Sequence, residues 1–174
     1  MTSILGISAF YHDSAAALLE NGKIVNCIQE ERLSRKKNDS SFPTLSIKKI
    51  LNIQNISLSE INYIIFYEKP FLKFNRILET CLAFAPYGFV QFMKSIPIWI
   101  KDKLFLKLKI IDELNKIEKI KDIQKKIKFS EHHLSHAASA FYASSFDESL
   151  ILTIDGVGEW ATSSISIGKK NKIK

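Results

Sequence analysis

Cysteine is scarce in this chain, with only two among 174 residues. Cys27 and Cys81 are far apart, do not form a CxxC pair and follow no secretory leader. This usage argues against a disulfide scaffold and favours a reduced setting. We therefore expect a cytoplasmic protein.

Long hydrophobic runs are also missing. The most apolar stretch, residues 77–100, is interrupted by two charged residues and two prolines. No uncharged run reaches the roughly 18 residues that a membrane-spanning helix needs. We expect no membrane span and interpret this stretch as helices that pack on a core or a partner.

Acidic residues are outnumbered by basic ones, 18 against 25, which gives a net charge of +7. Such an excess can attract phosphates, nucleic acid or an acidic membrane. Much of it, however, lies in residues 101–128 and 169–174, where lysines on solvated segments are the commoner explanation. Basic and aromatic residues do not alternate as they do on surfaces that bind single-stranded nucleic acid. We expect no nucleic-acid partner.

The chain does have an ordinary globular composition, with 46% hydrophobic and 25% charged residues. Its length is enough for one domain with a real core or for one lobe of something larger. The chain is therefore not expected to be disordered.

Three histidines lie close together in the last third of the chain. The pattern there predicts a helix over residues 131–143, with Ser130 as its N-cap. Because successive residues turn by roughly 100° around a helix, His132 and His136 project from one face, whereas His133 points elsewhere. No glutamate follows His132 directly, so the HExxH motif of metalloproteases is absent.

An aspartate follows this helix at the end of a predicted strand. Residues 149–154 are almost wholly apolar, as in a strand buried on both faces, and Asp155, Gly156 and Gly158 come next. Open α/β sheets bind ligands at the carboxyl ends of their strands. Two imidazoles and one carboxylate suit a first-row divalent ion that keeps positions open for substrate. A chance pair of solvated or core histidines is the alternative, and Asp155 adds support for the metal site without excluding that alternative.

The beginning of the chain predicts an antiparallel meander of three strands. An Asn-Gly pair at residues 21 and 22 signals a type I′ turn between the second and third strands. The strands correspond to three short apolar runs, at residues 3–8, 15–19 and 23–29.

Two polar segments near these strands have two interpretations each. The loop 9–14 contains His12 and Asp13, and its small residues would let backbone N–H groups approach an anion. An ordinary hairpin connection is the commoner interpretation. The charged segment 30–39 is either a solvated helix turn or a strip that contacts anions.

A helix and a fourth strand follow. Thr44 is a plausible N-cap for a helix through residue 53, and residues 61–67 predict a strand parallel to the first. The order is therefore β-β-β-α-β. Residues 70–126 have a helical pattern that includes an amphipathic helix over 102–126.

The last strands complete the prediction. Residues 127–129 form a short strand before the histidine helix, and residues 149–154 pair with 163–167 as a hairpin. This order resembles the ribonuclease H-like lobe of the actin and sugar kinase superfamily. We therefore expect an α/β fold with a mixed sheet and a helical insertion at about 70–126.

Four segments are also similar to the amino-terminal part of the NodU/CmcH-type carbamoyltransferases. They occur in the order of that family and cover most of the chain outside the insertion. The segments are ILGISAFYHDSAAALLENGKIV, EERLSRKKND followed by FP, EHHLSHAASAFYASSF, and ILTIDGVGEWATSS.

The resemblance implies an activity and a metal site. Enzymes of this family use carbamoyl phosphate and ATP to form carbamoyl adenylate, and then pass the carbamoyl group to an acceptor hydroxyl. By the resemblance, His132, His136 and Asp155 match the metal ligands. The family implies a divalent metal, iron first, with manganese or zinc as alternatives.

The resemblance also implies further site residues. His12 matches a histidine beside the carbamoyl transfer path, where it could orient the carbamoyl group or act as a base. Lys37 occupies the position of a basic residue near the same path, although Lys36 is adjacent. Gly156 and Gly158 would allow the backbone to approach the nucleotide closely.

The chain departs from the family in its length. Complete members carry a second ribonuclease H-like lobe and a YrdC-like domain, which 174 residues cannot hold. We expect a single partial domain, 1–174, that is a fragment, a truncated product or a subunit paired with a separate chain. Alone it should bind metal weakly and be inactive. The alternatives are a non-catalytic interaction module and a TsaD-like tRNA-modification protein.

Overall fold

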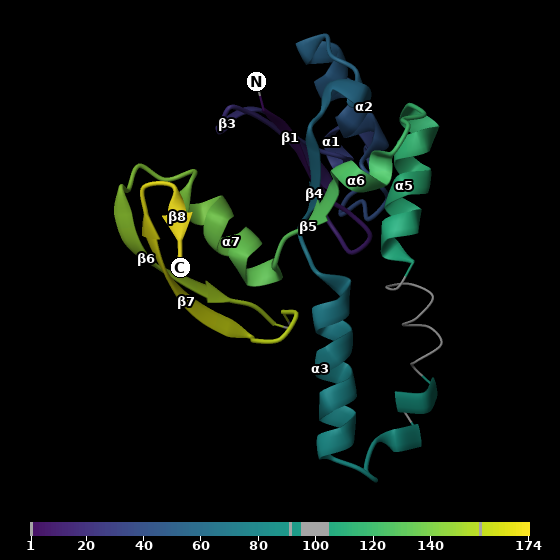
Figure 1. Ribbon diagram of the computed structural model, residues 1–174, viewed down its shortest axis with the longest axis vertical. Coiled ribbons are helices and arrows are strands. Elements are labelled where there is room, and N and C mark those ends of the chain that lie inside the picture. Colours follow the sequence, from purple (N-terminus) through teal and green to yellow (C-terminus); the bar gives the residue numbers. More distant parts are fainter. Residues whose placement is uncertain (1, 91, 95–104, 157) are drawn as a thin grey trace. The chain divides into compact units, whose positions relative to one another are not determined.

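The computed structural model describes residues 2–90, 92–94, 105–156 and 158–174 (Figure 1). The chain divides into two compact units. The first comprises Met1–Tyr67 and Leu106–Phe129, and the second comprises Glu68–Phe105 and Ser130–Lys174. The segment predicted as one helical insertion, 70–126, is therefore divided between the two units.

The first unit is built on a five-stranded mixed sheet. Its strands are β1 (Ser3–Ser8), β2 (Ala15–Glu20), β3 (Lys23–Gln29), β4 (Tyr63–Phe66) and β5 (Ile127–Phe129), in the order β3-β2-β1-β4-β5. β1 pairs antiparallel with β2 and parallel with β4, which confirms the predicted β-β-β-α-β order. Asn21 and Gly22 have φ angles of 50° and 82°, as the predicted type I′ turn requires. The α/β class is confirmed, and the ribonuclease H-like assignment stays a prediction.

The core of the first unit lies between this sheet and its helices. Leu5 of β1 and Ile64 of β4 sit opposite each other in the register and are almost fully buried. Helix α2 (Thr44–Gln54) adds Ile47 and Ile50, which are also fully buried. Side chains from one stripe of the helix thus cover the apolar face of the strands.

Helix α2 begins one residue earlier than the sequence predicted, because Pro43 and not Thr44 is the N-cap. The amides of Leu45 and Ser46, in its first turn, donate hydrogen bonds of 2.9 and 2.8 Å to the carboxylate of Glu30. Glu30 is only 2% exposed, although it belongs to the charged segment interpreted as a solvated turn or an anion strip. A buried carboxylate from another segment replaces the expected cap.

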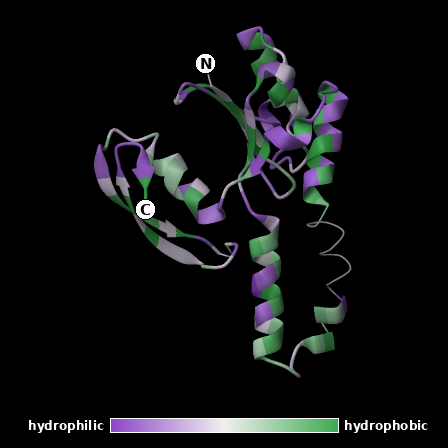
Figure 2. Ribbon diagram, in the orientation of Figure 1, coloured by the Kyte–Doolittle hydropathy of each residue, from purple (hydrophilic) through white to green (hydrophobic). Residues whose placement is uncertain are grey.

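Two helices stand where the sequence predicted one amphipathic helix over residues 102–126, of which 102–104 lie outside the described residues. They are α5 (Leu106–Ile117) and α6 (Ile123–Lys126). Hydrophilic and hydrophobic residues alternate along α5 (Figure 2). No proline or glycine marks the break, but Asp122 before α6 has a left-handed φ of 59°. This part of the predicted insertion belongs to the core of the first unit, through Leu106, Ile110, Leu114 and Ile123.

The second unit contains a separate three-stranded sheet and two long helices. Its elements are α3 (Pro70–Ala83), α7 (His132–Phe141), β6 (Glu148–Ile154), β7 (Ser163–Lys169) and β8 (Lys172–Ile173). The sheet order is β6-β7-β8, all antiparallel, which confirms the predicted hairpin. α7 packs on one face, where Phe141 and Ile151 share a small core. A Cβ on Gly168 would lie 2.6 Å from the Phe141 ring, so only glycine fits there.

Strand β6 is not buried on both faces, which corrects the sequence prediction. Ile151 and Thr153 are buried, whereas Leu150, Leu152 and Ile154 are exposed. The strand lies at one edge of an antiparallel sheet rather than in the middle of an open parallel one. An apolar run indicates that both faces are suited to burial, but the described part of the chain covers only one of them.

The apolar stretch 77–100 contains the second half of α3, and residues 91 and 95–100 of it lie outside the described part. Across residues 2–90, 92–94, 105–156 and 158–174, no helix combines the length and hydrophobicity required to cross a membrane.

Two loops of the first unit lie side by side. The amide of Ser14 donates a 2.8 Å hydrogen bond to the backbone oxygen of Asp39. The Asp39 carboxylate in turn accepts hydrogen bonds from the amide and the hydroxyl of Ser41, at 3.0 and 2.7 Å. The turn at Asp39 therefore supports the loop 9–14, which carries His12.

Replacing Asp39 by Asn is expected to reduce the pH dependence of folding stability. Hydrogen bonds from Ser34 and Ser41 lower the pKa of Asp39 from 3.8 to about 2. A carboxyl whose pKa is lower in the folded state contributes stability above its unfolded pKa, and that contribution is lost as the pH falls through the folded value. Wild-type stability, measured by urea unfolding, should therefore decline between pH 3.8 and about 2.

The Asn variant should be less stable at neutral pH and should decline less over that interval. Asp112→Asn, which removes an exposed carboxylate from α5, controls for the change in net charge. An equally steep decline in wild type and Asp39→Asn contradicts this prediction.

Candidate metal site

Two histidines of α7 and the aspartate after β6 converge on one point. His132 and His136 are one turn apart, and their Nε2 atoms are separated by 3.1 Å. Asp155 Oδ2 lies 2.6 Å from His132 Nε2 and 3.9 Å from His136 Nε2. The three ligand atoms all lie within 4.8 Å of one another. The convergence expected from the sequence is therefore present in the second unit.

Local structure explains this convergence. Helical periodicity places the two imidazoles on the same side of α7. At the end of β6 the amide of Asp155 donates a 2.7 Å hydrogen bond to the oxygen of Thr162, which closes the hairpin and fixes the aspartate. The helix begins at His132 with Glu131 as N-cap, not Ser130 as predicted. Ser130 directs its hydroxyl to the oxygen of Glu131 instead.

The protonation of the site suits a metal ligand set. Burial raises the pKa of Asp155, but hydrogen bonds from His132 and the Gly156 amide outweigh it and hold the pKa below its usual value. Burial lowers the pKa of His136, and the neighbouring His132 lowers it further, against the opposite effect of Asp155. At neutral pH the carboxylate is thus ionised and His136 is neutral. Those are the forms that bind metals.

The third histidine points elsewhere, as predicted. The His133 ring lies 6.1 Å from that of His132 and 6.5 Å from that of His136. Its Nε2 is buried and has no hydrogen-bond partner in the described part of the chain. It packs on Gly158, where a Cβ would lie 2.7 Å from this nitrogen and 2.5 Å from the oxygen of Ala161.

The two glycines predicted to approach a nucleotide differ in their surroundings. Gly158 is required by its contact with His133, which is a structural reason for a glycine. A Cβ on Gly156 would meet no atom within 4 Å, so the backbone there is open. The nucleotide role of both stays a prediction.

Glu159 supports the site and was missed by the sequence analysis. The residue is only 6% exposed, and its carboxylate accepts a 3.1 Å hydrogen bond from the amide of His132. It also accepts a hydrogen bond from the amide of Lys69, the N-cap of α3. The loop after Asp155 thus holds the first turn of both helices. These partners lie 27 and 90 residues away, so no local spacing could have revealed them.

The predicted catalytic residues belong to the first unit. His12 is exposed, and its Nδ1 lies 2.7 Å from Asp13 Oδ2. Lys37 is also exposed and lies just before the turn at Asp39 that supports the loop of His12. Their catalytic roles stay predictions.

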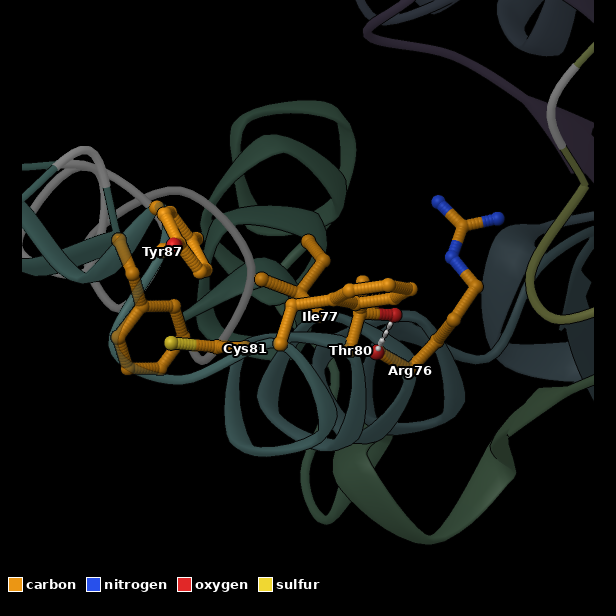
Figure 3. A pocket seen from close by; sticks show the side chains of 8 residues that line it. Arg76, Ile77, Thr80, Cys81 and Tyr87 are labelled. Carbon is orange, nitrogen blue, oxygen red and sulfur yellow. Dashed lines mark hydrogen bonds between the residues drawn. The ribbon is translucent and has the colours of Figure 1, made fainter.

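A cavity of about 700 Å³ lies along α3 in the second unit (Figure 3). Its side chains are mainly apolar and aromatic, and none of the three metal-competent residues lines it. The Arg76 guanidinium points away from Cys81 and Tyr87 in Figure 3 and donates a 2.7 Å hydrogen bond to the oxygen of Gly158. Arg76 therefore braces the loop that follows Asp155.

Replacing Glu159 by Gln is expected to lower the stability of the second unit. A neutral amide accepts weaker hydrogen bonds than a carboxylate, and a buried hydrogen bond to a charged group contributes roughly 1.5–3 kcal/mol. Thermal unfolding should therefore begin at a lower temperature than in wild type. Glu148→Gln, at an exposed carboxylate of β6, is the matched control and should behave as wild type. An unchanged Glu159→Gln variant would refute this role.

Comparison with known proteins shows the family of this chain. A family model described as carbamoyltransferase N-terminus matches residues 3–174. An uncharacterised protein from Synechocystis sp. is 53% identical over 99% of this chain and 28% of its own length. Nodulation protein NolNO from Sinorhizobium fredii is 35% identical over 96% of this chain and 23% of its own length.

An uncharacterised protein from Methanocaldococcus jannaschii is 29% identical over 98% of this chain and 33% of its own length. The chain thus spans between 23% and 33% of the length of these relatives. Because the family model covers nearly every residue, the relationship expected from the four quoted segments is confirmed. This chain belongs to the carbamoyltransferase family and corresponds to its amino-terminal region.

Proposed function

We propose that this chain provides the amino-terminal part of an ATP-dependent O-carbamoyltransferase. The complete enzyme would use carbamoyl phosphate and ATP to form carbamoyl adenylate and would transfer the carbamoyl group to an acceptor hydroxyl. The observation that carries this proposal is the convergence of His132, His136 and Asp155 within 4.8 Å in a member of the carbamoyltransferase family.

The donor set fits a first-row divalent ion. Imidazole nitrogens suit iron, manganese and zinc better than magnesium, which prefers oxygen ligands. Three protein ligands leave coordination positions for substrate oxygens. A bound ion would hold ATP phosphates and neutralise negative charge there. Iron is the metal we favour, with manganese or zinc as alternatives.

The chain's own residues would bind and orient the substrates. Asp13 pairs with Nδ1 of His12 and so leaves Nε2 as the atom that can face the carbamoyl group or accept a proton. Lys37 would offer a fixed positive charge to an anionic carbamate or phosphate. The open backbone at Gly156 is suited to a nucleotide that approaches the metal ligands.

The remainder of a longer polypeptide would complete the enzyme. The relatives are roughly three to four times as long as this chain, and we expect that remainder to supply a second lobe and a YrdC-like domain. A site open to water on one side holds phosphates weakly, because the local dielectric is high. The isolated chain should therefore bind metal weakly and turn over no substrate.

Two other functions are less well supported. A TsaD-like tRNA-modification protein would share the paired histidines, but the family match favours a carbamoyltransferase. A non-catalytic interaction module would have no need of converging metal ligands, and it should tolerate alanine at His132 and His136.

The isolated chain is expected to bind Fe(II), Mn(II) or Zn(II) with a dissociation constant above about 1 µM. This corresponds to a favourable binding free energy of less than about 8 kcal/mol. Calorimetric titration, with Fe(II) handled anaerobically, measures this. His132→Ala and His136→Ala should each abolish the heat of binding, because each removes one of three ligands. His133→Ala removes a neighbouring histidine outside the ligand set and should retain binding. Submicromolar affinity, or binding unaffected in the first two variants, contradicts the proposal.

The isolated chain is also expected to lack turnover. Incubated with carbamoyl phosphate, ATP and a divalent ion, it should leave ATP intact when nucleotides are separated by anion-exchange chromatography. The complete Synechocystis relative provides the positive control and should consume ATP only when carbamoyl phosphate is present. ATP consumption by this chain alone, dependent on carbamoyl phosphate, would show that no further polypeptide is required.

A further inference from the structure

One face of the sheet in the second unit is lined by aliphatic side chains that are largely exposed to solvent. We name it the aliphatic face, and it consists of Leu150, Leu152, Ile154, Ile165 and Ile167. Their exposed fractions range from 55% for Ile167 to 76% for Ile154. Leu150 pairs directly with Ile167, and Leu152 with Ile165, so the five side chains form a continuous surface across β6 and β7.

The residues on the exposed face of this sheet are unusual for a surface that faces solvent. An antiparallel sheet with one solvated face normally directs polar residues to the solvent. Here the face under α7 carries Ile151, which packs with Phe141, but also Thr153 and Ser164, whose hydroxyls form a hydrogen bond, and the small residue Gly168. The opposite face carries only aliphatic residues between its ends. The sequence therefore specifies a sheet that is covered on both sides.

Charge at the borders of this face supports the same conclusion. Glu148 and Lys169 stand opposite each other at one end and form a 2.9 Å ion pair. Ser163 pairs with Ile154 at the other end. Charged side chains are thus confined to the border, as in a protein interface with an apolar centre and a polar rim. A contiguous apolar patch of this kind marks an interaction site.

We infer that the aliphatic face is the docking surface for the polypeptide that follows the amino-terminal region in carbamoyltransferases. The family model describes this region as an N-terminus, and the relatives carry roughly two to three times this length again beyond it. A sheet face, unlike a sheet edge, is covered by a helix or by another sheet. Since α7 already covers the other face as one layer, we take the docked element to be a second helical layer, an amphipathic helix with an aliphatic stripe.

This inference goes beyond the proposed function, because docking at this face requires no metal and no substrate. The ligand atoms belong to α7 and to Asp155, whereas the aliphatic face belongs to alternate residues of β6 and β7. A failed metal titration would therefore leave the docking surface intact, and failed docking would leave the metal site intact.

The test co-expresses two polypeptides. One is this chain, and the other is the Synechocystis relative from which the region that matches this chain has been removed. The two should purify as a complex through a tag on either one. Leu152→Lys and Ile165→Lys should each weaken the complex at least about tenfold, because each places a charge in a desolvated apolar surface. Ile24→Lys, at a similarly exposed strand position of the other sheet, is the matched control and should bind as wild type.

Three outcomes overturn the inference. They are a remainder that does not associate with the wild-type chain, a complex that tolerates both lysines, and a wild-type chain that forms its own dimer through this face. Sedimentation velocity of the isolated chain detects a dimer, and loss of that dimer in the Leu152→Lys variant shows that it forms through this face. Circular dichroism shows whether the lysine variants fold. If they do not, Leu152→Thr and Ile165→Thr retain the preference for a strand and should still weaken the complex.

Discussion

A buried carboxylate, that of Glu159, determines the geometry of the second unit. It accepts hydrogen bonds from the first turns of α7 and α3, where helices have unpaired amides and a positive dipole end. Glu159 also lies only four residues after Asp155. The same short loop therefore carries Asp155 and also fixes the backbone amide of His132. The distance between the helix and the strand at the candidate metal site thus depends on this buried side chain.

The chemistry of the site follows from this packing. Burial raises the pKa of Asp155, but hydrogen bonds from His132 and the Gly156 amide lower it overall, and burial lowers the pKa of His136. An ionised carboxylate and a neutral imidazole are the forms of these two side chains that bind metal ions. The Nε2 atoms of His132 and His136 lie 3.1 Å apart. A cation bound by both nitrogens would stabilise this arrangement of the two rings. The structure thus brings together the three residues that helical spacing and the strand end predicted.

Periodic features could be predicted from the sequence, and features that depend on distant partners could not. The pairing of His132 with His136 follows from helical geometry, and the strand order follows from turns and apolar runs. Glu30 and Glu159 act as caps for helices far from them along the chain, which no local pattern encodes. The break before α6 occurs at Asp122 without proline or glycine. The burial of β6 was overestimated because apolar composition does not reveal what covers a strand.

Side chains of β6 point alternately to the two faces of the sheet, so adjacent residues at its end contribute to two different surfaces. Ile154 points to the aliphatic face and Asp155 belongs to the candidate metal site, with one peptide bond between them. Since the side-chain period of a strand is two, inserting or deleting one residue before Asp155 would exchange the faces of everything upstream. We therefore expect evolution to insert or delete residues in this strand only in pairs, because a change of two residues keeps every side chain on its original face.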